Sequence, residues 1–246
     1  MDRLTPEWAA PTNVRAVCTT RVGGVSASPY ASLNLGDHVG DDPAHVARNR
    51  AILEREIGAR PVYLKQVHGT AGVVSLDGNT EDGVEADGCW TSVRGVACTI
   101  MVADCLPVLF ASEDGEHVGA AHAGWRGLSG GIVEATARAM KVAPASLIAW
   151  LGPAIGPDAF EVGPEVKAAF ESRDASAARH FHPCREGKWL ADLPALTRMR
   201  LNAMGVTRIH GNDSSRVWCT VSNPSRFFSH RRDRVSGRFA AAVWRT

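Results

Sequence analysis

Two apolar runs separated by only two polar residues constrain the fold of this chain more than any other feature. The segments ACTIMVA (97–103) and LPVLFAS (106–112) are both of strand length, and Asp104 and Cys105 lie between them. Short apolar runs of this kind are typical of buried β-strands. Similar runs predict further strands in PVYL (61–64), AGVVSL (71–76), HVGAAH (117–122), LIAWLG (147–152), VTRIH (206–210) and RFAAAVW (238–244).

The clearest helix signals lie in residues 41–58. Asp41 or Asp42 can cap this helix, Pro43 suits its first turn, and Gly58 suits its end. Further helices are predicted over 128–140, 164–172 and 189–205, the last of them bent or begun by Pro194.

The order of these elements indicates the fold class. Strands come in clusters with helices interspersed, rather than in strict alternation, and the chain shows no internal repeat or clear linker. This pattern predicts an α+β fold with a mixed β-sheet and flanking helices. A length of 246 residues is enough for a substantial core, and we expect one domain over residues 1–246.

Composition excludes several classes of function. The formal net charge is +1, and the only arginine cluster is RFFSHRRDRVSGR near the end, so we expect no nucleic-acid partner. The N-terminus has no signal-peptide core, and no apolar run is long enough to span a membrane, which predicts a cytoplasmic protein. Six scattered cysteines without a CxxC pair are typical of thiols in a reducing compartment. Near-neutral charge and the lack of a coiled-coil pattern favour a monomer.

Three short segments carry candidate chemistry. They are LKQVHG with His68, MVADCLPVLF with Cys105, and VGAAHAGWRG with His122. Each candidate residue stands where a predicted strand ends or breaks, which is where folds expose functional side chains. Two imidazoles and one thiolate form a plausible catalytic zinc site, since such sites use three protein ligands and leave a fourth position for water.

The same atoms allow other interpretations. These polar residues could simply be satisfied groups of the core. Cys105 could be a nucleophile with His68 or His122 as its base, and Asp104 could orient that base. One Cys and two His also resemble a copper centre, but a multicopper oxidase needs several His pairs, and only one HxH pair occurs, in residues 180–182. The HxE…PCxxC signature of zinc deaminases is absent.

Several arginines and polar residues are candidates for binding an anion. Arg126 lies between Trp125 and Gly127, just before the helix predicted from Leu128, where a helix N-terminus and a guanidinium together attract phosphate. The alternative is that Arg126 stacks on Trp125. The other candidates are Lys65 beside the first motif, Arg48 and Arg50 on the first helix, and Arg21 and Asn34, for which turn chemistry is the alternative.

Taken together, these motifs resemble one known family. The segments TRVGGVSASPYASLNLGDHVGDDPAHVARNR, LKQVHG, ADCLPVLF, HAGWRG, WLGPAIGP, FEVG and FFSHRRD…GR occur in this order from about residue 12 to the end. The combination resembles the laccase-domain family, also called YfiH-like or polyphenol-oxidase-like, whose bacterial members are regarded as purine nucleoside phosphorylases. The resemblance implies a single α+β domain with a mixed sheet, related to a bacterial deamidating toxin domain.

The resemblance also implies a site and its activities. It implies a metal, usually zinc with copper as the alternative, held by His68, Cys105 and His122, with Asp104 beside them. It implies phosphorolysis of adenosine, inosine, guanosine and methylthioadenosine, and deamination of adenosine at the same site. Phosphorolysis needs an anion beneath a cationic sugar, which Arg126, Arg48, Arg50 or Lys65 could hold.

Two further functions are attached to the resemblance. A peptidoglycan-precursor editing amide hydrolase is the first alternative, and a copper-dependent phenol oxidase is the second. A metal-binding interaction module is the non-enzymatic alternative. One departure from the family is visible, because its terminal motif usually reads FFSYRR and this chain has His230 in the place of the tyrosine.

Overall fold

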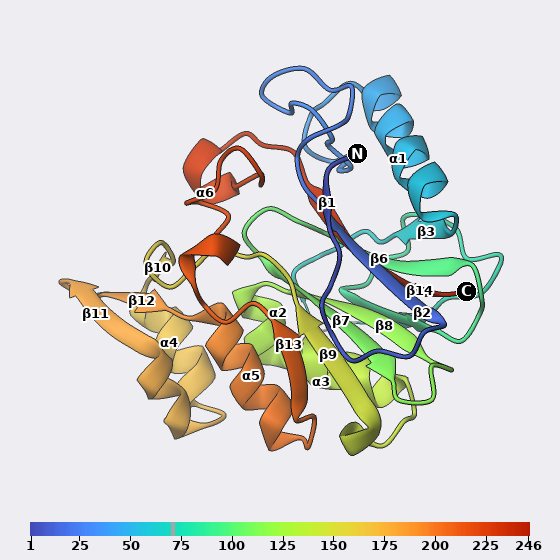
Figure 1. The fold of residues 1–246 in the computed structure, drawn as a ribbon. Coiled ribbons are helices and arrows are strands. Elements are labelled where there is room, and N and C mark those ends of the chain that lie inside the picture. Colours follow the sequence, from blue (N-terminus) through green and yellow to red (C-terminus); the bar gives the residue numbers. More distant parts are fainter. Residues whose placement is uncertain (70–71) are drawn as a thin grey trace.

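The computed structural model describes residues 1–69 and 72–246 (Figure 1). The strands are β1 (Arg3–Leu4), β2 (Val14–Thr19), β3 (Arg60–Tyr63), β4 (Val73–Ser75), β5 (Gly88–Thr91), β6 (Val96–Val102), β7 (Leu106–Ser112), β8 (Val118–Ala123), β9 (Leu147–Leu151), β10 (Glu161–Val162), β11 (Phe181–Arg185), β12 (Lys188–Ala191), β13 (Arg208–Gly211) and β14 (Phe239–Arg245). The α-helices are α1 (Pro43–Ile57), α2 (Trp125–Gly130), α3 (Ile132–Ala139), α4 (Pro164–Glu171), α5 (Leu193–Ala203) and α6 (His230–Asp233).

The strands form two large sheets and one small one. The first large sheet has the order β1-β2-β14-β6-β3, and the second has the order β13-β9-β7-β8-β5-β4. Each combines antiparallel pairs with parallel ones, which are β3 with β6 in the first sheet and β9 with β13 and β4 with β5 in the second. The predicted α+β fold with mixed pairing is therefore confirmed, although the pairing is divided between stacked sheets. A small sheet of β10, β12 and β11 lies beside α4.

The two large sheets pack face to face, with helices on their outer sides (Figure 1). Their facing sides share a buried core that includes Ile100, Leu109 and Trp150. On the far side of the first sheet, Ala97 and Met101 pack with Leu53 of α1. Helices α3 and α5 cover the far side of the second sheet. Strands buried on both faces need apolar residues at every position, which explains the continuous apolar runs of β6 and β7.

The two runs that open the sequence argument belong to different sheets. Strand β6 lies in the first sheet and β7 lies in the second, so residues 103–105 carry the chain from one to the other. This crossing is where Asp104 and Cys105 interrupt the apolar pattern. Asp104 and Cys105 therefore lie at the edge where strand β6 of one sheet ends and strand β7 of the other begins.

The predicted strands and helices mostly agree with the structure to within one or two residues. The helix predicted over 41–58 is α1, capped by the Asp42 side chain and ended by Gly58 with a φ of 64°. The strand predicted over 71–76 corresponds to β4, although Ala71 lies outside the described residues. The structure adds strands that the pattern did not indicate, namely β1, β2, β5, β10, β11 and β12.

The helix predicted over 128–140 is wrong in its start and in its continuity. It begins three residues earlier, at Trp125, and it is two helices, because Gly131 between them has a φ of 103°. That left-handed conformation ends one helix and begins another. Arg126 therefore lies inside the first turn of α2 rather than before a helix.

The helix predicted over 189–205 is also wrong in its first turn. Residues 188–191 form β12, which pairs with β10 and β11. Asp192 then caps α5 by accepting a hydrogen bond from the amide of Ala195. Pro194 stands in the first turn of α5, so it begins this helix and does not bend it.

Within the described residues, no helix combines the length and apolar character that a membrane span requires.

Candidate metal centre and active site

His68, Cys105 and His122 come together where the two large sheets end. Cys105 immediately precedes β7, and His122 lies near the end of the neighbouring strand β8, opposite Pro107 in the register. His68 follows β3 on a loop of the other sheet. The structure therefore gathers three residues that are distant in sequence, as the metal-site hypothesis requires.

The geometry of the three side chains suits one metal ion. One donor atom from each residue lies within 4.8 Å of the other two. The two imidazole rings stand edge to face, with centroids 4.7 Å apart and an interplanar angle of 82°. Two imidazole nitrogens and a thiolate form a donor set that zinc accepts in tetrahedral sites with an open position. The residues present thus fit the ion that the resemblance implies.

Gly124 explains why small residues surround His122 in the sequence. A Cβ atom at this position would stand 3.0 Å from the Sγ of Cys105 and 3.5 Å from the Cδ2 of His68. Both contacts involve side chains of the candidate metal centre. Glycine here leaves room for the centre itself.

Asp87, which the sequence analysis did not propose, holds both histidines in place. Its Oδ1 accepts hydrogen bonds from the Nδ1 of His122 at 2.7 Å and from the amide of His68 at 3.0 Å. Its Oδ2 accepts from the amides of Val67 at 3.2 Å and Gly69 at 2.8 Å. A carboxylate on the far nitrogen of a metal-binding imidazole fixes the tautomer and aims the other nitrogen at the metal.

Cys105 and His122 shift each other's pKa. Burial opposes the ionisation of Cys105, but the charge of His122 and hydrogen bonding to both imidazoles lower the pKa of the thiol to about 6. Burial likewise opposes the protonation of His122, but Cys105 and Asp87 raise its pKa to about 9. At neutral pH Cys105 is therefore a thiolate, which is the form that binds metals, and His122 is protonated, so a metal that binds here displaces that proton.

Backbone strain concentrates at the same place. His68, Asp104 and Arg234 have φ values of 59°, 90° and 63°. Residues other than glycine rarely adopt a positive φ. All three residues line one pocket. Strained residues persist where the surrounding structure enforces them, and they cluster at functional sites.

This pocket has a volume of about 210 Å³ and contains all three members of the candidate metal centre. A space of this size admits a small molecule rather than a folded partner. Ile155 and Phe160 form part of an apolar wall. The polar residues of the lining are His38, Gln66, His68, Asp104, Cys105, His122, His230, Arg231, Arg234 and Arg238.

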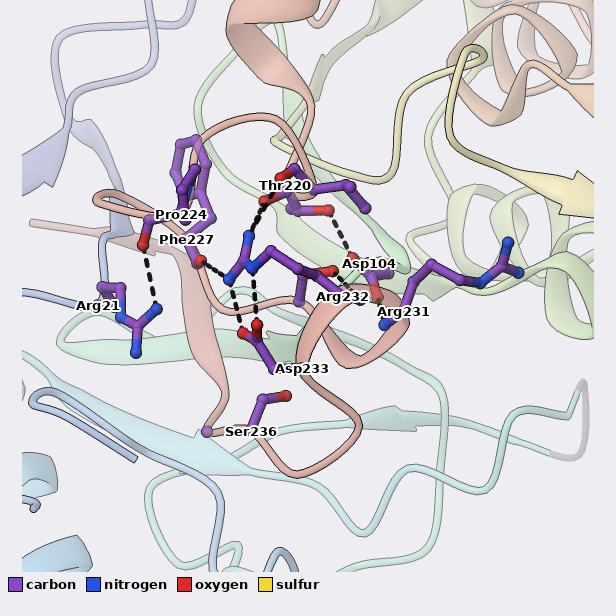
Figure 2. A network of polar contacts seen from close by, with 12 residues as sticks. Arg21, Asp104, Thr220, Pro224, Phe227, Arg231, Arg232, Asp233 and Ser236 are labelled. Atoms are coloured by element: carbon purple, nitrogen blue, oxygen red, sulfur yellow. Dashed lines mark hydrogen bonds and ion pairs between the residues drawn. The ribbon is translucent and has the colours of Figure 1, made fainter. Parts of the chain in front are cut away.

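Asp104 does not orient either histidine, so that part of the nucleophile hypothesis is wrong. Its Oδ1 accepts a hydrogen bond from the hydroxyl of Thr220, and its Oδ2 accepts from the amide of Arg231, both at 2.6 Å (Figure 2). Both oxygens are directed to the C-terminal part of the chain. Asp104 thereby ties the crossing that carries Cys105 to helix α6, while Asp87 has the orienting role.

Arg126 does not line the pocket. Its side chain is exposed, and its guanidinium lies 4.4 Å above the ring of Trp125. The stacking alternative is therefore the one that the structure shows. The prediction of a phosphate site failed here because the helix begins before Arg126 and the side chain turns outward.

The other proposed anion-binding residues also lie outside the pocket lining; they are Lys65, Arg48, Arg50, Asn34 and Arg21. Arg50 and Arg21 stack on the aromatic rings of Tyr63 and Phe228. Lys65 pairs with Glu85 on the surface, and Arg48 is exposed on α1. Asn34 instead supports Arg238, whose amide donates to its Oδ1 at 2.8 Å.

The HxH stretch stands apart from the centre. His180 ends a short 3-10 helix and His182 lies exposed in β11, and neither lines the pocket. Among residues 1–69 and 72–246, His68, Cys105 and His122 form the one cluster of potential ligands. A second copper group of the kind that multicopper oxidases use is not found in that part of the chain.

The residues that sequence reasoning missed had only faint signals. Asp87 stands in VEADGCW, where no long apolar run draws attention to an acid. Arg231, Arg234 and Arg238 belong to the terminal arginine cluster, which the sequence analysis weighed only as a signal for nucleic-acid binding. The FFSHRRD…GR motif could have indicated these arginines, because polar motif residues at the end of a strand or helix are candidates for binding.

Comparisons with known proteins identify the family. A family model described as multi-copper polyphenol oxidoreductase laccase matches residues 15–246. A Pseudomonas aeruginosa protein named purine nucleoside phosphorylase is 50% identical over 98% of this chain and 97% of its own length. The Escherichia coli purine nucleoside phosphorylase YfiH is 46% identical over 98% of both chains.

A solved structure shows the same fold. The crystal structure of a Neisseria meningitidis protein of the DUF152 family is 47% identical, covers 100% of this chain and 99% of its own, and has a TM-score of 0.95. Both the family model and the relatives span nearly the whole chain. This chain belongs to the laccase-domain family, the YfiH-like proteins.

Proposed function

We propose that this chain is a purine nucleoside phosphorylase whose site uses a zinc ion held by His68, Cys105 and His122. The observation that carries the proposal is the convergence of these three side chains in one pocket, with Asp87 fixing both histidines. The names of the relatives from Pseudomonas aeruginosa and Escherichia coli support the reaction class. The donor set supports zinc.

Phosphorolysis of a nucleoside exchanges one bond for another at the sugar. An oxygen of phosphate bonds to C1′ while the bond from C1′ to the purine nitrogen breaks. The electron pair of that bond leaves with the base, which takes up a proton. Because the sugar becomes cationic on the way, the site must hold an anion beside it and stabilise the departing base.

The residues of the pocket suit these tasks. A bound zinc ion supplies Lewis-acid chemistry and lowers the pKa of a coordinated water. Ile155 and Phe160 offer an apolar wall against which a purine can pack. Arginines at the mouth supply positive charge for an anionic co-substrate. Asp87 fixes the imidazole of His122 and the backbone of His68.

The proposal includes deamination of adenosine at the same site. Water adds to C6 of the purine, the bond from C6 to the exocyclic nitrogen breaks, and ammonia leaves with inosine as the product. This reaction uses no phosphate, so it depends on the candidate metal centre alone. We expect adenosine, inosine, guanosine and methylthioadenosine as substrates of phosphorolysis, and adenosine for deamination.

The test is to incubate purified protein with adenosine, with and without phosphate, and to identify the products by chromatography. Adenine with ribose 1-phosphate only in the presence of phosphate supports phosphorolysis, and inosine without phosphate supports deamination. Single replacements of His68, Cys105 and His122 by alanine are expected to remove both activities. A Cys105→Ala variant with full activity and full metal content would show that the ligand set is wrong.

A second candidate function is favoured by the arrangement in space of Cys105, His122 and Asp87. His122 lies between the thiol and the carboxylate, as in the catalytic triad of an amide hydrolase. The Cys105 thiolate would attack an amide carbonyl, His122 would protonate the leaving amine, and water would then hydrolyse the thioester. The substrate of such an amide hydrolase would be a peptidoglycan precursor that contains an amide bond. Hydrolysis of such a precursor by metal-free protein, blocked by iodoacetamide, would favour it over the phosphorylase.

A further inference from the structure

The pocket has an excess of positive charge that its own residues do not neutralise. Three arginines line it, namely Arg231, Arg234 and Arg238, against the single carboxylate of Asp104. Both oxygens of Asp104 already accept hydrogen bonds from Thr220 and from the backbone of Arg231 (Figure 2). The carboxylate therefore holds the fold together and is not directed at the guanidinium groups.

Two of the three arginines differ in how their side chains are used. Arg231 donates from Nη1 to the carbonyls of Ala159 and Glu161 and lies over the ring of Phe160. Arg238 donates from Nη1 to groups of its own turn, which are the carbonyls of Ser236 and Gly237 and the hydroxyl of Ser236. Its Nε and Nη2 meet no acceptor among the residues that the structure describes, and no described carboxylate lies within 4.0 Å of it. Arg238 thus keeps donors available for a ligand.

Contacts with residues 34–36 fix the position of Arg238. Its amide donates to Asn34 at 2.8 Å, and its carbonyl accepts from the amide of Leu35 at 3.0 Å. A Cβ atom at Gly36 would stand 2.8 Å from the Cγ of Arg238, so glycine is needed there for the arginine stem to pass. The SLNLG segment therefore aims this side chain into the pocket.

A half-buried guanidinium without a carboxylate partner is unfavourable unless a ligand compensates it. Burial lowers the pKa of Arg238, while the charges of Cys105 and Asp104 raise it. The side chain lines the same pocket as the candidate metal centre. Arginine nevertheless stays protonated. A permanent cation with open donors beside a metal centre matches the chemistry of an oxyanion.

Two flanking residues complete the arrangement. Arg234 lines the same pocket from the end of α6, where its φ of 63° holds the backbone in a strained turn. His38 lines the pocket from the N-terminal part of the chain, two residues beyond Gly36. Burial lowers its pKa, and the charge of Arg238 lowers it further. Arg234 can donate hydrogen bonds to an anion held by Arg238, whereas the Nδ1 of His38 already faces the Oδ1 of Asp37 at 3.4 Å.

We propose that Arg238 binds the phosphate co-substrate, with Arg234 as a flanking donor. This assignment rests on the proposed phosphorylase function and names the protein residues that bind its second substrate, phosphate. A planar guanidinium offers two parallel donors to two phosphate oxygens, which fixes the orientation of the anion. Phosphate held there lies in the same pocket as the candidate metal centre, so it can reach a sugar bound between them.

The test compares Arg238→Gln, Arg238→Lys and the control Arg55→Gln in zinc-loaded protein. Arg55 is exposed on α1 and does not line the pocket. We expect the KM for inorganic phosphate to rise about 10- to 100-fold in Arg238→Gln, from the loss of charge-assisted hydrogen bonds. We expect the affinity for the nucleoside, measured by calorimetry without phosphate, to stay unchanged. Arg238→Lys should lie between wild type and Arg238→Gln.

Gly36→Ala supplies an independent second variant. It leaves every pocket side chain in the sequence and only crowds the stem of Arg238, so a higher KM for phosphate is expected here as well. Zinc content and the thermal unfolding temperature establish that each variant is folded, and Arg238→Lys and Gly36→Ala carry the test if Arg238→Gln does not fold.

Two results separate this inference from the function on which it rests. If wild type forms ribose 1-phosphate and the variants keep the wild-type KM for phosphate, the assignment of Arg238 is wrong and the phosphorylase function stands. If wild type forms no ribose 1-phosphate, the proposed function is wrong and Arg238 has no phosphate to bind. Equal losses of nucleoside and phosphate affinity would also overturn the assignment, since they indicate a structural role.

Discussion

Asp87 connects the two histidines of the candidate metal centre through a single buried side chain. Its carboxylate accepts from the Nδ1 of His122 and from three successive amides of the loop that carries His68. Burial opposes its ionisation, but the hydrogen bonds from His122 and Gly69 and the charge of His122 hold its pKa below the ordinary value. An ionised acceptor is needed here because every neighbour is a donor.

The variant Asp87→Asn is expected to weaken zinc binding. An amide group would turn one donor toward another donor and would release His122 from its fixed tautomer. Loss of such a supporting group typically lowers metal affinity by about 10- to 100-fold. Competition with a chromogenic chelator measures the zinc dissociation constant.

Asp82→Asn is the matched control for that experiment. Asp82 likewise accepts a backbone hydrogen bond, from the amide of Tyr63, but it does not line the pocket. Its variant should bind zinc as wild type does. Equal zinc affinity in Asp87→Asn and wild type would refute the supporting role of Asp87.

At the residue scale, the sequence indicated the three candidate ligands but not their surroundings. His68, Cys105 and His122 were visible because each interrupts or ends an apolar segment. Asp87 was missed because its contacts join segments that only the fold brings together. Arg126 was proposed because a helix N-terminus can be inferred locally, and Arg238 was missed because the approach of residues 34–36 to it cannot.

At the scale of elements, apolar periodicity predicted the central strands well. Strands β6, β7, β8, β9 and β14 are buried along their whole length, so their sequences are mainly apolar. The segment WLA (189–191) was assigned to a helix because tryptophan, leucine and alanine are compatible with one. Its pairing with β10 and β11 in the small sheet overrides that weak preference.

Gly131 is the position at which the predicted single helix breaks, and Gly131→Ala tests this. The φ of 103° is unfavourable for any residue with a Cβ atom. We expect the free energy of unfolding to fall by about 1–2 kcal/mol, measured by urea denaturation.

Gly78→Ala serves as its control, because a Cβ atom there would meet no heavy atom within 4 Å. That substitution should leave the stability unchanged or raise it slightly. A Gly131→Ala variant as stable as wild type would mean that this turn does not require the left-handed conformation.

At the scale of the whole molecule, the sequence predicted mixed pairing but not the division into two stacked sheets. The register of β14 between β2 and β6 joins the end of the chain to its beginning, and nothing local specifies such long-range pairing. The crossing at residues 103–105 shows the consequence for function. It places Cys105 between a loop of one sheet and a strand of the other.

Because the candidate ligands join both sheets, metal removal should lower the stability of the entire fold. A ligand that binds only the folded state, present at about 1,000 times its dissociation constant, adds about 4 kcal/mol. For a chain of this size, that corresponds to a rise in Tm of about 8–16 °C. Differential scanning calorimetry of metal-free and zinc-loaded protein measures it, and a Tm that does not respond to zinc would contradict the arrangement.

The most direct test of the central proposal is zinc titration of metal-free protein during turnover of adenosine with phosphate. Formation of ribose 1-phosphate should rise in proportion to bound zinc and reach its maximum at one ion per chain, and the His122→Ala variant should show no such rise. Full activity in metal-free protein, or a maximum that needs more than one ion per chain, would contradict a single zinc centre at His68, Cys105 and His122.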